Sequence, residues 1–170
     1  GKTIGLFYGD YFARPGKQGG AWMSSLRDQQ SLDGEVLPLI TNNCNFIKGD
    51  PALLSFDDAR TVFHEFGHAL HGLLSEVRYP RLSGTNVARD FVELPSQLFE
   101  HWLEEPQVLS RFARHYQTGK PMPAALMDKL TAARHFNQGF QTVEFLASAF
   151  TDLDFHSENL ENCDTLALES

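Results

Sequence analysis

The sequence predicts a mainly α-helical fold with a small β-hairpin or β-sheet at its N-terminal end. Before residue 47, short segments rich in aromatic and β-branched residues are separated by turn-forming residues, which is typical of strands. From residue 56 onwards, apolar residues recur at helical spacing in about five segments. The first of these segments contains the pattern H-E-x-x-H at residues 64–68.

Residues 4–12 predict a first strand, followed by a glycine-rich loop over 13–20. Residues 21–30 fit neither a strand nor a helix clearly. Residues 36–46 predict a second strand, and Pro38 places it at a sheet edge because proline has no N–H for the ladder. An edge strand beside the helix of the motif is suited to pairing with an extended peptide. A plain structural hairpin is the alternative.

Ser55 and Asp58 form a capping-box pattern, with Asp in place of Glu, and predict a helix over 56–75. A loop over 78–90 follows. The next helix is predicted over 90–103, where Pro95 is tolerable only near the first turn or at a kink. Further helices are predicted over 108–118, 124–137 and 139–156, and a polar, acidic, poorly ordered segment over 157–170.

Composition limits the class of protein. The chain has 170 residues, of which 42% are hydrophobic and 21% charged, as expected of a soluble globular domain. A net charge of −8 argues against nucleic acid and anionic membranes as partners, and no apolar run has the length of a bilayer span. Cys44 and Cys163 do not form a C-x-x-C pair, and the start does not resemble a signal peptide. We therefore expect free thiols and a cytoplasmic location, with the periplasm as the alternative.

The H-E-x-x-H pattern predicts a metal site. His64 and His68 lie one helical turn apart, so both imidazoles can reach one ion. Glu65 follows about 100° further round the helix, where its carboxylate can face a water molecule bound to that ion. The alternative is an amphipathic helix with two incidental histidines. Burying two histidines and a glutamate among residues such as Phe63 and Phe66 is costly unless a partner satisfies them.

A catalytic zinc ion commonly has three protein ligands and one open position. Glu93 is our candidate for the third ligand, because a helix–loop–helix return can bring it back across the ion. Spacing alone does not choose Glu93 over Glu76 or Glu100. The candidates for supporting the ligands through hydrogen bonds are Asp57, His71, Gln97 and Glu100. For His71, an ordinary structural role is the alternative.

The stretches H-E-F-G-H-A-L-H at 64–71 and R-D-F-V-E-L-P-S-Q-L-F-E-H-W at 89–102 closely resemble the thimet oligopeptidase family of zinc metallopeptidases. More narrowly, they resemble its peptidyl-dipeptidase branch. The likeness runs from near residue 5 to about residue 156. Four other segments carry it as well: 14–22, 38–46, 118–123 and 136–147.

This resemblance implies a zincin-like pair of helices and one zinc ion per chain. The ion would be bound by the residues matching His64, His68 and Glu93, with Glu65 as the general base. It also implies short peptides as substrates and release of C-terminal dipeptides. An oligopeptide endopeptidase of the same family and a zinc-binding fragment without turnover are the alternatives, and a helical interaction module without a metal stays open.

Members of the family are several times longer than this chain. Residues 1–156 therefore resemble part of a catalytic domain, and we expect the remainder of a longer enzyme as its partner. In members of the family, that remainder includes a stretch with a histidine and several tyrosines that bind substrate. The residues expected to border the substrate groove here are Gly19, Gly20, Ala21, Asn43, Cys44 and Asn45.

Overall fold

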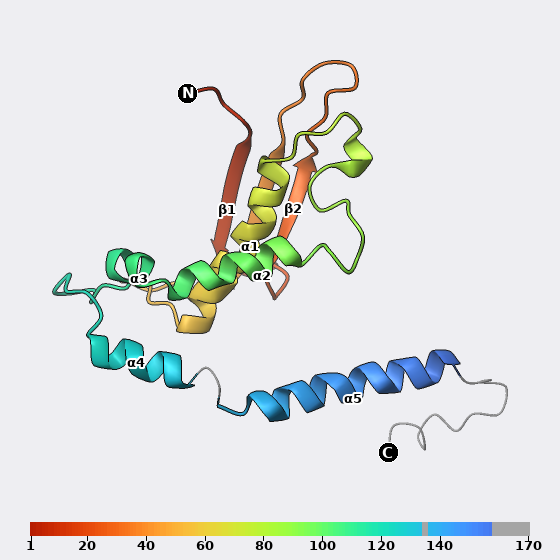
Figure 1. Cartoon of the computed structure of the whole chain (residues 1–170). Coiled ribbons are helices and arrows are strands. Elements are labelled where there is room, and N and C mark those ends of the chain that lie inside the picture. Colours follow the sequence, from red (N-terminus) through yellow and green to blue (C-terminus); the bar gives the residue numbers. More distant parts are fainter. Residues whose placement is uncertain (134–135, 158–170) are drawn as a thin grey trace. The chain divides into compact units, whose positions relative to one another are not determined.

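The computed structural model describes residues 1–133 and 136–157, and it divides the chain into two compact units, Gly1–Pro121 and Met122–Ser170 (Figure 1). A three-stranded sheet occupies the N-terminal part of the first unit, and helices make up most of the rest. The predicted mainly helical chain with an N-terminal sheet is confirmed at this level. The predicted polar segment 157–170 lies, except for Ser157, outside the described residues, and the predicted boundary at residue 156 stays a prediction.

The sheet has the strand order β1-β3-β2, so the last strand in the sequence is the central one. β1 (Leu6–Phe12) runs parallel to β3 (Leu39–Phe46), and β2 (Trp22–Arg27) runs antiparallel to it. β2 lies within the segment 21–30, which the sequence left open. Among the described strands, β1 and β2 therefore form the two edges of the sheet.

The prediction that Pro38 marks an edge strand is wrong, because β3 is the central strand. Pro38 directly precedes the strand, where its missing N–H costs no ladder hydrogen bond. Its carbonyl accepts a hydrogen bond from the Leu6 N–H, at a distance of 3.0 Å, and so continues the pairing with β1.

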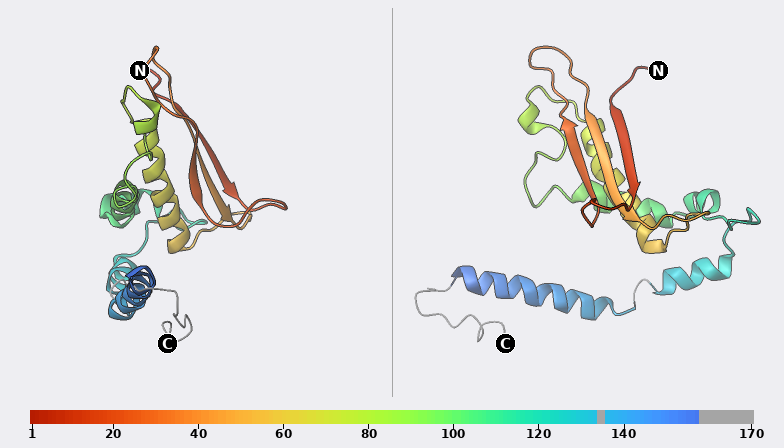
Figure 2. Two further views of the ribbon diagram at one scale, coloured as in Figure 1. Left: turned by 90° about the vertical axis from the view of Figure 1, so that its right-hand side faces the viewer. Right: turned by 180° about the vertical axis from the view of Figure 1, so that it is seen from behind.

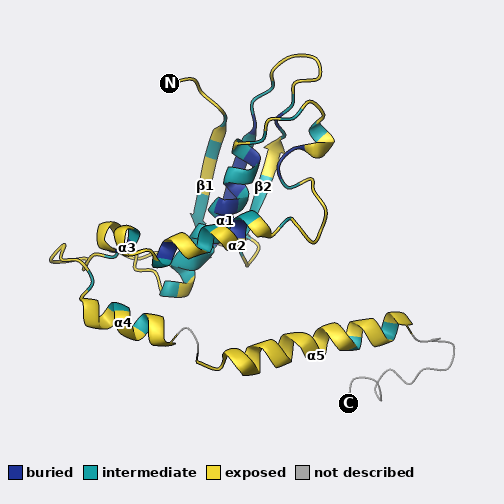
Figure 3. Ribbon diagram, in the orientation of Figure 1, coloured by how far each residue is buried: buried dark blue, intermediate teal, exposed yellow. Residues whose placement is uncertain are grey.

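Helix α1 (Phe56–Leu73) packs on one face of this sheet (Figure 2). Burial alternates along β3, and its buried side chains belong to Ile40, Asn42, Cys44 and Phe46. These residues and α1 form most of the buried centre of the unit (Figure 3). The predicted capping box is confirmed, because Ser55 and Asp58 each accept from the other's backbone N–H.

Helix α2 (Leu94–Glu100) packs against α1 and is shorter than the predicted helix over 90–103. It begins after Glu93, and Pro95 stands in its first turn, where a missing N–H is harmless. The short helix η1 (Pro80–Leu82) interrupts the loop that leads to α2. The chain continues through η2 (His101–Glu104) and α3 (Pro106–Phe112), so the helix predicted over 108–118 is wrong beyond residue 112.

The second unit contains α4 (Ala124–Ala133) and α5 (Gln138–Ser157), at the positions predicted for the last two helices. Neither helix has a buried residue in the part of the chain that is described. Among the described residues, no helix combines the length and the apolar character needed to cross a membrane.

Candidate metal centre

His64, His68 and Glu93 come together where α1 faces the start of α2. The carboxylate oxygen Oε2 of Glu93 lies 3.3 Å from Nε2 of His64 and 3.1 Å from Nε2 of His68. One ligand atom from each of the three side chains lies within 4.8 Å of the other two. Within the described residues, this is the group of histidine and acidic side chains that can hold a metal ion.

These distances fit a tetrahedral metal ion. Zinc binds imidazole nitrogen and carboxylate oxygen at about 2.0–2.2 Å, so two ligand atoms on one tetrahedron lie about 3.3 Å apart. The two imidazole rings stand nearly perpendicular, at 84°, with their centroids 4.9 Å apart. Two neutral nitrogens and one carboxylate are also a ligand set used by catalytic zinc sites. The residues present therefore fit a single zinc ion.

Glu100 fixes the ring of His64 from the side opposite to Glu93. Its Oε1 atom lies 2.6 Å from Nδ1 of His64. Because an ionised carboxylate only accepts hydrogen bonds, Nδ1 of His64 donates to Glu100. Nε2 faces the candidate metal position, the usual arrangement for a ligating histidine. Of the four candidates for a supporting role, Glu100 is the one whose side chain contacts a ligand.

His68 is more deeply buried than His64, with 12% of its side chain exposed against 26%. Burial lowers the pKa of His68, although the negative charge of Glu93 partly opposes the change. The imidazole is therefore kept neutral, which is the state that binds a metal. Its Nδ1 atom is buried and has no hydrogen-bond partner.

Glu65 is buried, with 6% of the residue exposed. Burial raises the pKa of its carboxyl group, with a further contribution from the negative charge of Glu93. The charge of His64 and a backbone hydrogen bond from Met23 act in the opposite direction. A carboxyl group with a raised pKa is a stronger base, so this environment suits a group that takes up a proton.

Ser96 holds the third ligand in place. Its hydroxyl lies 2.9 Å from Oε2 of Glu93 and 2.8 Å from the Glu93 carbonyl, and it donates its hydrogen toward these acceptors. Ser96 is completely buried against α1. Ser96 was not among the residues predicted for the site. The signal that could have indicated it is a small hydroxyl side chain three positions after Glu93, in the first turn of a predicted helix.

Gly67 allows α2 to approach α1 closely enough for this contact. A Cβ atom at Gly67 would lie 2.6 Å from Cα of Ser96 and 2.9 Å from the carbonyl oxygen of Pro95. Both are backbone atoms that a rotamer change cannot move. The glycine inside the H-E-x-x-H pattern therefore determines how near Glu93 comes to the histidines.

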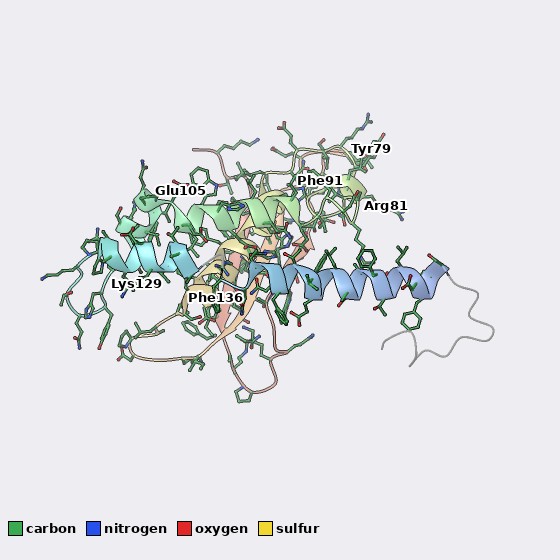
Figure 4. The ribbon with its side chains drawn as sticks, turned by 60° about the horizontal axis from the view of Figure 1, so that its bottom comes forward. Tyr79, Arg81, Phe91, Glu105, Lys129 and Phe136 are labelled. Carbon is green, nitrogen blue, oxygen red and sulfur yellow. The ribbon has the colours of Figure 1, made fainter. Side chains whose placement is uncertain are left out.

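In the described part of the chain, the side chains of the other candidate supporting residues form no hydrogen bond with His64, His68 or Glu93. The Asp57 side chain is 88% exposed and accepts a hydrogen bond from Arg60. Gln97 is exposed, and its backbone N–H donates to the Glu93 carbonyl. His71, near the end of α1, has its ring centroid 6.3 Å from that of Phe91. Phe91 lies in the loop before α2 (Figure 4). His71 also lines an apolar hollow of about 440 Å³ together with residues such as Leu98 and Trp102.

The loop that precedes β2 is fixed by two side chains. Lys17 is buried to 4% exposure, and its ammonium group donates to the carbonyls of Asp10, Phe12 and Cys44. Nδ2 of Asn45 donates to the carbonyls of Gln18 and Gly20, at 2.7 and 2.8 Å. Gly20 has a φ of +97°, a conformation that favours glycine.

The residues expected to border a substrate groove fall into two groups. Gly19 and Gly20 are exposed in the loop before β2, and Ala21 is half-buried. Asn43 and Asn45 are half-buried on the face of β3 that points away from α1, whereas Cys44 is fully buried beneath α1. Burial raises the pKa of the Cys44 thiol to about 11, so the thiol is neutral and acts as a small core residue.

Two histidines one turn apart and a glutamate from the next helix form a group that could hold a metal ion, as in proteins with an H-E-x-x-H metal centre. Residues 1–167 match the model of Peptidase family M3. The chain belongs to this peptidase family.

Three relatives illustrate the similarity. The chain is 48% identical to dipeptidyl carboxypeptidase of Escherichia coli strain K12, over 100% of this chain and 26% of the relative. It is 40% identical to oligopeptidase A of the same organism, over 91% of this chain and 24% of the relative. It is 39% identical to thimet-like oligopeptidase of Dictyostelium discoideum, over 95% of this chain and 25% of the relative. The chain thus spans about a quarter of the length of the curated relatives it matches.

Proposed function

We propose that this chain carries the zinc centre of a peptidase that cleaves short peptides and releases dipeptides from their C-terminal ends. The observation that carries the proposal is the convergence of His64, His68 and Glu93, whose ligand atoms lie within 4.8 Å of one another. Membership of Peptidase family M3 supports the reaction class. The zincin-type arrangement of α1 and α2 is part of the same proposal.

The residues of the centre have distinct roles in this proposal. His64, His68 and Glu93 would hold Zn²⁺, with Glu100 and Ser96 fixing His64 and Glu93. When bound, zinc supplies a Lewis acid that polarises a carbonyl and lowers the pKa of bound water toward about 7. Glu65 accepts a proton as water attacks the scissile carbonyl, and then delivers it to the leaving amine.

We propose that the peptide lies along the free edge of β2. Among the described strands, β2 pairs only with β3, so its other edge offers backbone donors and acceptors to an extended peptide. Met23 on this strand also hydrogen-bonds Glu65 through its backbone, which brings the edge next to the proposed base. Gly19, Gly20 and Ala21 would border the groove where the loop enters β2, and Asn45 would act by holding that loop.

Dipeptide release is favoured over endopeptidase activity by the relatives. Identity is 48% to the dipeptidyl carboxypeptidase of E. coli and 40% to its oligopeptidase A, over similar shares of those proteins. A zinc-holding fragment without turnover stays as the second candidate, because the chain spans about a quarter of these relatives.

Metal analysis and a peptide assay test the proposal together. The purified chain should bind one zinc ion after chelation and reloading, and His68→Ala should abolish binding. His156→Ala, in exposed α5, is the matched control and should bind zinc normally. Equal zinc content in wild type and His68→Ala would refute the centre.

Mass spectrometry of digested short peptides should show C-terminal dipeptides, and zinc binding without any cleavage would support the fragment without turnover.

A further inference from the structure

Three side chains in the described part of the chain have buried polar atoms without a hydrogen-bond partner. These atoms are both amide atoms of Asn42, Nδ1 of His68 and Nδ1 of His71. Asn42 is the most unusual of them, because it is 1% exposed and its amide group leaves both its donor and its acceptor unpaired. Buried polar groups in proteins are nearly always hydrogen-bonded, directly or through ordered water. The unpaired amide group of Asn42 therefore needs a hydrogen-bond partner that the protein atoms do not supply.

Asn42 lies at the level of His68 along α1. At one end of the β3–α1 contact, a Cβ at Gly72 would lie 2.7 Å from Cδ1 of Ile40. Along β1, which runs parallel to β3, a Cβ at Gly5 would lie 2.8 Å from Cδ2 of Leu73, and the ring centroids of Phe7 and Phe66 lie 5.4 Å apart. Both strands therefore run antiparallel to α1. Two strand residues span about 6.8 Å, the length of about four to five helical residues, so Asn42 lies that far before Gly72 along α1.

The turn of α1 opposite Asn42 therefore contains His68 and Ala69. Asn42 belongs to the alternating set of β3 residues that are buried on the α1 side of the sheet. Its position is also fixed from the neighbouring strand, because Asn42 pairs with Met23 of β2, whose backbone hydrogen-bonds Glu65. Two neighbouring elements therefore place Asn42 near the turns of α1 that carry Glu65 and His68.

The two ligand histidines differ in how their second nitrogen is satisfied. Nδ1 of His64 is 2.6 Å from a Glu100 oxygen, whereas Nδ1 of His68 is buried without a partner. A ligating histidine needs an acceptor at its second nitrogen to keep the proton there and to hold the ring orientation. The unpaired acceptor at the level of His68 is Oδ1 of Asn42.

We propose that Asn42 is a positioning residue for His68, an inference that rests on the zinc centre proposed above. One buried water molecule accepts the hydrogen bond from the Nδ1–H group of His68 and donates to Oδ1 of Asn42. This link would hold the His68 ring in the orientation that directs Nε2 toward the metal position. Asn42 acts through His68 and does not touch the substrate.

Zinc affinity of three variants tests the proposal. The 170-residue chain is titrated with Zn²⁺ in competition with a chelator. Asn42→Leu keeps the size of the side chain but removes the acceptor, and should weaken zinc binding about 10–100-fold. Asn42→Asp retains an acceptor and should stay within a few-fold of wild type. Ile40→Val, on the same face of β3 but opposite Gly72, controls for altered packing and should bind zinc normally.

Two outcomes separate this proposal from the proposed function. Wild-type zinc affinity in Asn42→Leu would overturn it while leaving the proposed function intact. Failure of wild type to bind zinc would overturn both.

Discussion

Glu65 is a carboxyl group held almost entirely out of water beside the metal position. Burial is the main cause of its raised pKa, and the nearby charge of Glu93 adds to it. Without a metal ion, the folded chain holds this charge at neutral pH at a cost in stability. The same environment that makes Glu65 a suitable base therefore weakens the metal-free fold.

Replacing Glu65 by Gln should stabilise the metal-free chain at pH 7, by on the order of 1 kcal/mol. Folding raises the pKa of Glu65. Its contribution to the free energy of unfolding is therefore fully present below the pKa that the group has in the unfolded chain, and it is lost as the pH rises through the pKa of the folded chain. The difference between variant and wild type should therefore vanish near pH 4. Urea denaturation with a chelator present, at both pH values, measures it. Glu144→Gln in α5 is the control, and a destabilised Glu65→Gln at pH 7 would contradict the prediction.

Among the residues of the candidate metal centre, helix geometry alone predicts the pair of histidines. His64 and His68 share a face because they are four residues apart on one helix. Glu93 could be chosen over Glu76 and Glu100 only through the resemblance to a family. The hydrogen bond of Ser96 and the placement of Asn42 depend on how α1 packs against α2 and β3, which no local pattern specifies.

The contact between α1 and α2 depends on the absence of a side chain at Gly67. The Cα atom of Ser96 lies 2.6 Å from the position that a Cβ atom would occupy there. Stacked and tilted contacts of Phe99 with Phe63 and Phe66 complete the contact, at centroid distances of 5.5 and 5.9 Å. The two helices thus pack as a pair on which the position of Glu93 depends.

Gly67→Ala should push α2 away from α1 and move Glu93 from the histidines. We expect a loss of about 1–3 kcal/mol in stability, the usual cost of overpacking, and at least a tenfold loss of zinc affinity. Denaturation and chelator competition measure the two effects. A Cβ at Gly139 would meet no atom within 4 Å, so Gly139→Ala is the matched control. Normal zinc affinity in Gly67→Ala would mean that α2 tolerates the displacement.

Elements with a strong local pattern were predicted well, and those that depend on partners were not. The capping box of Ser55 and Asp58 marks the start of α1 because it uses only neighbouring residues. The strand β2 has no clear alternation, with Trp22 and Met23 followed by two serines, and it forms by pairing with β3. Pro38 was misinterpreted because a proline just before a strand resembles one within an edge strand.

All three proposed ligands belong to the unit Gly1–Pro121, although a long loop separates the two histidines from Glu93. A metal ion that binds only the folded arrangement shifts the folding equilibrium of that unit. The unit Met122–Ser170 supplies no ligand to this group among its described residues. Metal binding should therefore affect the two units differently.

Zinc at a free concentration one hundred times its dissociation constant should stabilise the first unit by about 2.7 kcal/mol. Hydrogen exchange should slow in α1, α2 and β3 on adding zinc, and stay unchanged in α5. His68→Ala should abolish the response, while His156→Ala should retain it. Equal slowing in α5 would show that the two units unfold together.

The imidazole of His64 joins the two ends of α2. Glu93, which precedes the helix, lies 3.3 Å from one ring nitrogen, and Glu100, its last residue, lies 2.6 Å from the other. For this ring to turn over, both carboxylates must release it at the same time. The reorientation rate of one aromatic ring should therefore report how often its contacts with the two ends of α2 open together.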